Sequence, residues 1–217
     1  MQDIVFVSGL WRSGTSILAL VLKELGVYMG DEFNHRPALK AVSPTGNWEE
    51  IRLKTLCHEM MRPPHLHERM PRAVFQRRLG EWMHDQYENA GVRLPGGKHP
   101  ILTYFLPDLA AAAFERRFSL RVIDIERSSR ATIDSMCARR FFGGNRKELH
   151  TLVTEGLDRK RHGLDQIEHI QISMRDLIED TGRTINEIVS FLSINACSDT
   201  RLKAADIINH QHVHHGY

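Results

Sequence analysis

The chain has few cysteines, and they lie far apart. Cys57, Cys137 and Cys197 are the only three among 217 residues. An odd number at such wide spacing forms neither a disulfide framework nor the paired pattern of a zinc site. We therefore expect a protein of a reducing compartment that needs no metal.

Long apolar runs and a strong net charge are also missing. No apolar stretch approaches the roughly 18 residues of a membrane span. The first residues, Met1-Gln2-Asp3, lack the basic segment and the cleavage site of a signal peptide. A formal net charge of +2 is too small to indicate a nucleic acid or a membrane surface as a partner. We expect a cytoplasmic protein in which any anion site is local.

The composition that remains, 41% hydrophobic and 26% charged, is that of an ordinary globular protein, and the length suits one α/β domain over residues 1–217. Residues 4–7 form a short β-branched run, typical of a strand buried on both faces. A glycine-containing turn follows, and apolar spacing then predicts a helix over 16–25 that stops at Gly26. Strand, turn and helix in this order open a parallel nucleotide-binding sheet.

The same patterns predict the later elements. We expect strands at 120–125 and 169–173 and a loop at 91–97. Apolar periodicity and helix stop signals predict further helices, over 48–61, 73–89, 100–114, 131–140 and 185–192. The tail, residues 209–217, carries His210, His212, His214 and His215, and we expect it to be loosely ordered rather than a metal site.

The turn after the first strand has the features of a phosphate-binding loop. It reads Gly9-Leu10-Trp11-Arg12-Ser13-Gly14-Thr15-Ser16. Backbone N–H groups of such a turn converge on one point, and the helix that follows adds partial positive charge. A nucleotide hydrolase or kinase carries a lysine directly after the second glycine. Here Thr15 takes that place and Arg12 supplies the cation, which weakens the kinase interpretation.

The segment from Arg12 to Ser16 resembles the 5′-phosphosulfate loop of sulfotransferases, which take a sulfuryl group from 3′-phosphoadenosine 5′-phosphosulfate (PAPS). The family usually has proline before the cation, where this chain has Trp11. The resemblance implies a P-loop-like three-layer α/β fold, with a central, mostly parallel sheet flanked by helices. It also implies that Arg12, Ser13, Gly14, Thr15 and Ser16 bind the 5′-phosphosulfate.

A second segment resembles the family's 3′-phosphate site, in which an arginine follows a strand and a serine comes eight residues later. Arg127 and Ser135 have this spacing after the strand predicted at 120–125. An arginine leaving a strand end can hold a phosphate with two hydrogen bonds. Ser135 lies about two turns into the next helix, on the same side if that helix folds back along the sheet. The family's Arg-Lys-Gly loop near the C-terminus is absent.

The base that accepts the acceptor's proton has several candidates. Glu49 matches the Gly-aromatic-Glu segment of bacterial sulfotransferases, whereas Glu50 matches the Glu-Glu-Ile of heparan N-sulfotransferases. We favour Glu49 narrowly. Against both stands a purely structural interpretation, because acidic residues in the first turn of a helix stabilise it.

Two further candidates remain open. His99 follows Lys98, in a segment where relatives have Lys-Asp-Pro or Lys-Thr-His, and histidine has a pKa suited to a general base. Lys98 matches both versions and implies a contact with the sulfate or the bridging oxygen. Asp31 and Glu32 resemble the catalytic glutamate region of tyrosylprotein sulfotransferases.

The sequence therefore predicts a PAPS-dependent sulfotransferase that acts on a hydroxyl or amine of a small-molecule or glycan acceptor and releases 3′-phosphoadenosine 5′-phosphate (PAP). Segments 27–47 and 62–97 are the expected acceptor side. The alternatives are a small-molecule or nucleotide kinase of related fold and a PAP-binding module without catalysis. The acceptor and the oligomeric state have no signature in the sequence.

Overall fold

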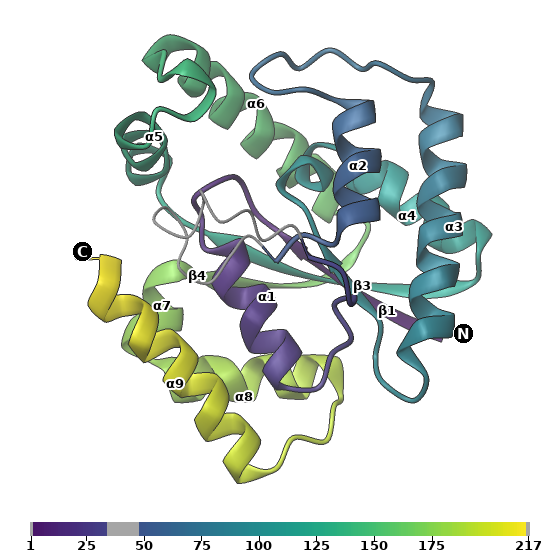
Figure 1. Cartoon of the computed structure of the whole chain (residues 1–217), viewed down its shortest axis with the longest axis vertical. Helices are drawn as coiled ribbons and strands as arrows, with labels where there is room; N and C mark the ends of the chain where they lie inside the picture. The colour runs from purple at the N-terminus through teal and green to yellow at the C-terminus, as the bar shows by residue number, and fades with distance from the viewer. Residues whose placement is uncertain (1, 34–47, 216–217) are drawn as a thin grey trace.

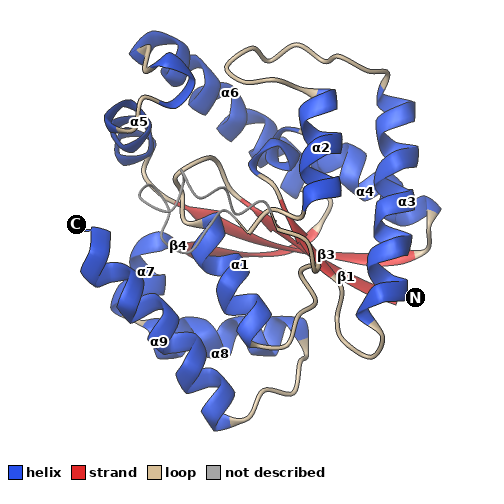
Figure 2. Cartoon of the chain, viewed as in Figure 1, coloured by secondary structure: helices blue, strands red, loops and turns tan. Residues whose placement is uncertain are grey.

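The computed structural model describes residues 2–33 and 48–215. Four parallel strands form one sheet in the order β2-β1-β3-β4. They are β1 (Gln2–Ser8), β2 (Gly96–Lys98), β3 (Phe118–Glu126) and β4 (Glu168–Ser173). Helices cover both faces (Figures 1 and 2). This arrangement confirms the predicted α/β fold with a central parallel sheet.

One face of the sheet is covered by helices from both ends of the chain. They are α1 (Thr15–Glu24), α7 (Met174–Glu179), α8 (Thr181–Leu192) and α9 (Ser198–His215). The other face is covered by α2 (Ile51–Met60), α3 (Arg72–Ala90), α4 (Leu106–Glu115), α5 (Ser129–Ala138) and α6 (Arg146–Leu164), together with the short 3-10 helices η2 (Pro100–Tyr104) and η3 (Phe141–Gly143). The sheet therefore lies between two helical layers.

Successive side chains of β1 point to opposite faces of the sheet, and both faces are covered, which explains why its apolar run is continuous. Ile4 and Phe6 pack into the core on the α2–α6 side, and Val5 and Val7 pack into the core on the α1 side. Each of the four is at most 2% exposed. A central strand covered on both faces needs apolar residues at every position.

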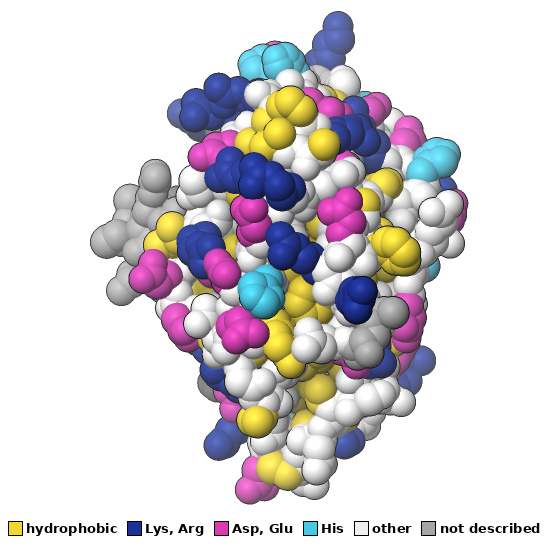
Figure 3. All heavy atoms as spheres, turned by 90° about the vertical axis from the view of Figure 1, so that its right-hand side faces the viewer, with side chains coloured by type: hydrophobic (Ala, Val, Ile, Leu, Met, Phe, Trp, Pro, Cys, Tyr) yellow, Lys and Arg dark blue, Asp and Glu magenta, His cyan; other side chains and the backbone are white. Residues whose placement is uncertain are grey.

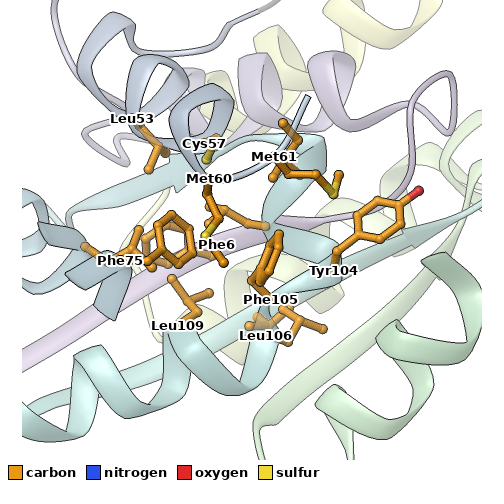
Figure 4. Packing of buried hydrophobic residues seen from close by; sticks show 14 of the residues in the cluster. Phe6, Leu53, Cys57, Met60, Met61, Phe75, Tyr104, Phe105, Leu106 and Leu109 are labelled. Atoms are coloured by element: carbon orange, nitrogen blue, oxygen red, sulfur yellow. The ribbon is translucent and has the colours of Figure 1, made fainter. Parts of the chain in front are cut away.

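The larger core lies on the α2–α6 side. Figure 4 shows Phe6 from the sheet packed among side chains from α2, α3, η2 and α4. Phe75 and Phe105 meet edge to face, with ring centroids 5.4 Å apart. This packing fixes α2 and η2 over the sheet, and residues at the starts of both carry groups of the site described below.

Several predicted boundaries need correction. Helix α2 begins at Ile51 rather than residue 48, because Trp48 has a left-handed φ of 48° and Glu50 is extended. The loop predicted over 91–97 ends in β2. Helix α9 continues to His215, so the backbone of 209–215 is helical where we expected a loose tail.

The described surface carries mixed charge. The face in Figure 3 has Lys and Arg interspersed with Asp and Glu over α3 and neighbouring elements. This mixture is what a formal net charge of +2 leads one to expect. Within the described ranges, no helix combines the length and apolar character needed to cross a bilayer.

Two helical glycines allow a matched test of packing. An added Cβ at Gly156 of α6 would lie 2.6 Å from Leu10 Cδ2 and 2.7 Å from Tyr104 Oη, whereas nothing lies within 4 Å of one at Gly182 of α8. We expect Gly156→Ala to destabilise the protein by about 1–3 kcal/mol through overpacking. We expect Gly182→Ala to stabilise it by about 0.4–1 kcal/mol, because alanine restricts the unfolded chain.

Denaturant unfolding of both variants measures these changes. Equal effects of the two substitutions would contradict the packing of α6 against the loop after β1.

Candidate active site

The predicted site residues lie at the carboxyl ends of three neighbouring strands. The glycine loop follows β1, Lys98 ends β2, and Arg127 follows β3. In open α/β sheets this edge is where ligands bind.

The loop after β1 is tightly built. Thr103 Oγ1 accepts from Gly9 N at 3.0 Å and donates to Gly9 O at 3.1 Å, which ties the loop to η2. An added Cβ at Gly9 would lie 2.7 Å from Ser13 Oγ and 2.8 Å from Ile125 O, so only glycine fits. Gly14 has φ 107° and precedes the first residue of α1. The loop therefore presents a helix N-terminus at the carboxyl edge of the sheet, the geometry that favours anions.

Two side chains of the loop are committed to its structure. Ser13 Oγ donates to Leu10 O at 2.7 Å, and the side chain is buried. Thr15 is also buried, at the start of α1. Of the predicted hydroxyl donors, Ser16 is the one that faces a cation, since Lys98 Nζ lies 3.2 Å from Ser16 Oγ.

The two predicted phosphate motifs meet in space. Arg12 Nε donates to Ser135 Oγ at 3.2 Å across 123 residues. Arg127 Nη1 donates to Arg12 O at 3.2 Å across 115 residues. Helix α5 therefore folds back so that Ser135 faces the loop, as the spacing required. The neighbouring Asp134 turns to Arg146 instead, with an ion pair of 2.8 Å.

A cavity of about 610 Å³ opens beside Arg127, between the β3–α5 turn, α6 and the start of α7. Ser128, Arg161, Met174 and Arg175 are among its lining residues. Neither residues 174–178 nor Arg161 were among the site residues predicted from the sequence. The feature that could have identified these residues is their position, because each lies on an element that follows a strand end or packs beside one.

A second cluster surrounds Lys98. This side chain is 3% exposed, and its Nζ lies 3.1 Å from Glu49 Oε1. Glu49 Oε2 lies 3.4 Å from Lys54 Nζ and 3.8 Å from His99 Nε2. The loop helix, β2 and the residue before the cap of α2 thus meet at one buried ammonium group.

Opposing effects set the pKa of Glu49. Burial alone would raise the pKa of this carboxyl, but Lys98, His99 and Lys54 together lower it to about 2. Burial lowers the pKa of Lys98, and Glu49 opposes that effect. Glu49 is therefore a carboxylate at neutral pH.

His99 is arranged as a neutral imidazole. Burial lowers the pKa of His99 to about 3, outweighing the pull of Glu49 in the other direction. Its Nδ1 accepts from Ile101 N at 3.2 Å, which assigns the ring proton to Nε2, the atom facing Glu49. In this arrangement His99 can donate to Glu49 and has no lone pair free to act as a base.

Glu50 holds structure together. Its carboxylate accepts from Arg52 N at 3.1 Å, Leu53 N at 2.7 Å and Trp82 Nε1 at 2.8 Å. It is the N-cap of α2 and joins that helix to α3. The structural interpretation of an acidic residue at this helix start therefore holds for Glu50.

Asp31 and Glu32 lie elsewhere. Asp31 Oδ2 accepts from Tyr28 Oη at 2.6 Å, and both acidic side chains line a separate cavity with Glu50 and Gln86. The structure thus brings Glu49 to Lys98 and places the other acidic candidates around a different space. The remainder of segment 27–47, residues 34–47, falls outside the described residues.

A buried charge network under Arg127 has no counterpart in the sequence analysis. Lys160 Nζ lies 2.6 Å from Asp124 Oδ2 and 2.7 Å from Glu126 Oε1. The network fixes the carboxyl end of β3 directly before Arg127. Lys160 follows the spacing of Leu149, Val153 and Gly156 along α6, so a charged residue occupies the buried stripe of this helix.

Among the residues whose side chains the structure describes, 2–33 and 48–208, no group of three or more His, Cys, Asp or Glu is arranged to hold a metal ion. Cations around the site include Arg12, Lys98 and Arg127. These groups and the helix N-terminus can stabilise negative charge on a transferring group.

The burial of His99 predicts a pH dependence of stability. Its pKa lies near 3 in the folded protein and near 6.5 when exposed. The unfolded chain therefore binds the extra proton between these values, so the contribution of neutral His99 is lost as the pH falls from about 6.5 toward 3. At pH 5 the loss amounts to about 2 kcal/mol. Replacing His99 with glutamine, which does not titrate, should remove this part of the acid destabilisation.

The measurement is the difference in melting temperature between pH 7 and pH 5 for the wild type, His99→Gln and a control, His84→Gln, at an exposed position of α3. The melting temperatures of the wild type and the control should fall further between pH 7 and pH 5 than the melting temperature of His99→Gln. Parallel behaviour of all three proteins would show that His99 is not held neutral.

Comparisons with models of protein families and with curated proteins find no match. Solved structures do match. One is a sulfotransferase domain from the curacin biosynthetic pathway, with TM-score 0.60 and 18% identity over 92% of this chain and 77% of that one. Another is the sulfotransferase domain of the Synechococcus PCC 7002 olefin synthase, with TM-score 0.55 and 20% identity over 94% and 78%. Mouse sulfotransferase SULT7A1, in complex with PAP, has TM-score 0.56 and 14% identity over 100% and 68%.

At such identities the likeness concerns the fold. It agrees with the resemblance carried by the two phosphate motifs, and it extends over at least 92% of the chain. The chain has the fold of the sulfotransferases.

Proposed function

We propose that this protein transfers a sulfuryl group from PAPS to a hydroxyl or amine of a small-molecule or glycan acceptor. The observation that carries the proposal is the pair of hydrogen bonds joining Arg12 to Ser135 and Arg127 to the Arg12 backbone. Two motifs that the sequence predicts to bind anions, more than 100 residues apart, thereby lie side by side. A donor with phosphate groups at both its 5′ and its 3′ end needs such a pair.

The roles of the donor-side residues follow from their positions. Arg12, Ser16 and the backbone from Ser13 to Thr15 would bind the 5′-phosphosulfate, at the N-terminus of α1. Arg127 and Ser135 would bind the 3′-phosphate. The 610 Å³ cavity beside Arg127 has room for the nucleoside.

Lys98 bears on the choice between sulfotransferase and kinase. The position that holds lysine in kinases is Thr15, whose side chain is buried. A lysine nevertheless reaches the loop, because Lys98 Nζ lies 3.2 Å from Ser16 Oγ. From β2 it would approach the group being transferred from the acceptor side. Both a sulfuryl and a phosphoryl group would gain from this cation, so the preference for PAPS over ATP depends on the proposed 3′-phosphate residues, Arg127 and Ser135.

The proposed reaction is a single displacement. The acceptor oxygen or nitrogen attacks sulfur, the bond from sulfur to the bridging phosphate oxygen breaks, and PAP leaves with the electrons of that bond. The acceptor's proton passes to Glu49. Lys98 would neutralise charge on the bridging oxygen, and Arg12 would do so on the sulfuryl oxygens.

Glu49 is the base that the geometry supports. It is ionised, it contacts Lys98, and His99 Nε2 lies 3.8 Å from its carboxylate. A pKa of about 2 makes it a weak base in the ligand-free arrangement. Donor charge next to Ser16 would draw Lys98 away from Glu49, which would raise the pKa of Glu49 when the acceptor is in place.

Donor recognition tests the two-motif site. Arg127→Ala should weaken PAP binding by on the order of 2–4 kcal/mol, as expected for losing a charge-assisted bidentate contact. Binding of AMP, which has no 3′-phosphate, should change little. Calorimetric titration measures both ligands, with and without Mg²⁺.

Arg130→Ala is the matched control, since its side chain is 90% exposed in the same turn and pairs with Asp134. If Arg127→Ala weakens the binding of PAP and AMP equally, Arg127 supports the loop and does not recognise the 3′-phosphate. A wild type that binds ADP as tightly as PAP, or only with Mg²⁺, would favour a nucleotide kinase.

The two adjacent glutamates give the test of catalysis. Glu49→Gln should lower sulfuryl turnover by roughly 10²–10⁴, the usual effect of losing a general base. PAP affinity should stay nearly unchanged. Glu50→Gln should instead cost about 1 kcal/mol of stability through its cap, with turnover per folded molecule close to wild type.

Turnover is measured with [³⁵S]PAPS against a panel of alcohols, amines and glycans, after melting curves confirm folding. The opposite pattern, with Glu50→Gln inactive and Glu49→Gln active, would transfer the role to Glu50. PAP binding by a wild type that sulfates no member of the panel would favour the module without catalysis.

A further inference from the structure

A cavity of about 240 Å³ lies beside β2, apart from the Lys98 cluster. It is lined from residues 28–32, from the start of α2 and from α3. Three of its lining residues are acidic: Asp31, Glu32 and Glu50. Arg52, the cation among its described lining residues, forms an ion pair of 2.5 Å with Asp85 outside it. We call this cavity the acidic pocket, and its lining carries excess negative charge.

Gln86 provides an independent indication of a ligand. Its side chain lines the acidic pocket and is 4% exposed. Its Nε2 has no hydrogen-bond partner among the described residues. A buried donor left in this state costs about 1–3 kcal/mol. An oxygen atom of a bound molecule would satisfy it.

Gly30, which has no side chain, forms the part of the pocket wall next to Gln86. Gly30 has φ 101°, and an added Cβ would lie 2.7 Å from Glu50 Cγ and 3.2 Å from Gln86 Nε2. The Gln86 amide therefore points toward the Gly30 backbone, between the acidic residues and α3. A side chain at position 30 would remove space beside Glu50 and Gln86.

The acidic side chains differ in what they can still bind. Glu50 already accepts three hydrogen bonds, and Asp31 accepts one from Tyr28 Oη. Glu32 is exposed at the rim. A carboxylate offers about four acceptor positions, so Asp31 and Glu32 retain capacity for a charged donor.

These observations define the chemistry of the occupant. It is positively charged, because the lining is acidic, and it carries an oxygen acceptor for Gln86. A single metal ion does not fit, since the described carboxylates do not form a cluster that could ligate one. We propose that the acidic pocket binds a protonated amine with a neighbouring hydroxyl or carbonyl oxygen, with the ammonium group at Asp31 and Glu32 and the oxygen at Gln86.

The binding does not depend on sulfuryl transfer, and it is tested without nucleotide. Glucosamine and glucose are a matched pair of probes, because one hydroxyl of glucose is replaced by an ammonium group in glucosamine. In ¹H–¹⁵N NMR titrations, the reporters are the Trp82 indole N–H, which donates to Glu50, and the Gln86 side-chain amide. Glucosamine should shift both signals, and glucose should do so at least tenfold more weakly.

Variants locate the site. Glu32→Gln and Asp31→Asn should each weaken the binding of glucosamine by about tenfold, the order expected for losing one charge-assisted hydrogen bond. Gln86→Met should also weaken it while keeping the bulk of the side chain. Glu59→Gln is the control, because Glu59 lies on α2 and pairs with Arg78 outside the pocket. Its affinity for glucosamine should match wild type.

The proposal is overturned if glucosamine leaves both reporters unmoved, if glucose acts equally, or if Glu32→Gln and Asp31→Asn both keep wild-type affinity. A parallel PAP titration separates this result from the proposed function. A wild type that binds glucosamine but not PAP would contradict the proposed sulfotransferase function alone. A wild type that binds PAP but not glucosamine would contradict the proposal for the acidic pocket alone.

Discussion

The Lys98 ammonium group lies between oxygens from two distant parts of the chain, Ser16 on the loop helix and Glu49 before α2. A buried ammonium group is costly unless it is paired and hydrogen-bonded. The position of Lys98 at the end of β2 therefore constrains where α1 and α2 can lie. Because η2 begins two residues later and holds Gly9 through Thr103, the same short segment also fixes the glycine loop. Removing Lys98 would leave the buried carboxylate of Glu49 with Lys54 as its cation and a neutral His99 beside it.

Much of the arrangement around Arg12 and Arg127 could be predicted from the sequence, because parallel strands bring their carboxyl ends to one edge. The run at residues 4–7 and the strand before Arg127 were both recognisable, and each is followed by its motif. Ser135 lies about two turns into α5, which begins two residues after Arg127, so the serine faces the loop when α5 returns along the sheet. The local sequence pattern and the topology of the sheet agree here, so a few residues were enough to predict this arrangement.

The rest depended on contacts that no local pattern encodes. β2 contains Gly96 and Gly97, which have low strand propensity, yet added Cβ atoms there would lie 2.9 Å from Met29 Sδ and 2.6 Å from Trp82. These glycines are required by neighbours from distant segments, so the sequence suggests a loop. Helix α6 was missed for a related reason, since Lys160 interrupts its apolar stripe. The lysine is buried because Asp124 and Glu126 on β3 neutralise it.

The consecutive glutamates show how backbone geometry separates two identical side chains. Glu50 is extended, with φ −61° and ψ 136°, and its side chain turns to Trp82 and the first amides of α2. Glu49 faces Lys98 on the other side. Residues adjacent along extended backbone point in opposite directions, so one carboxylate caps the helix while its neighbour faces Lys98. The low pKa of Glu49 then follows from the ion pair that keeps Lys98 in place before a donor arrives. A ligand that competes for Lys98 would strengthen Glu49 as a base at the moment when a base is required.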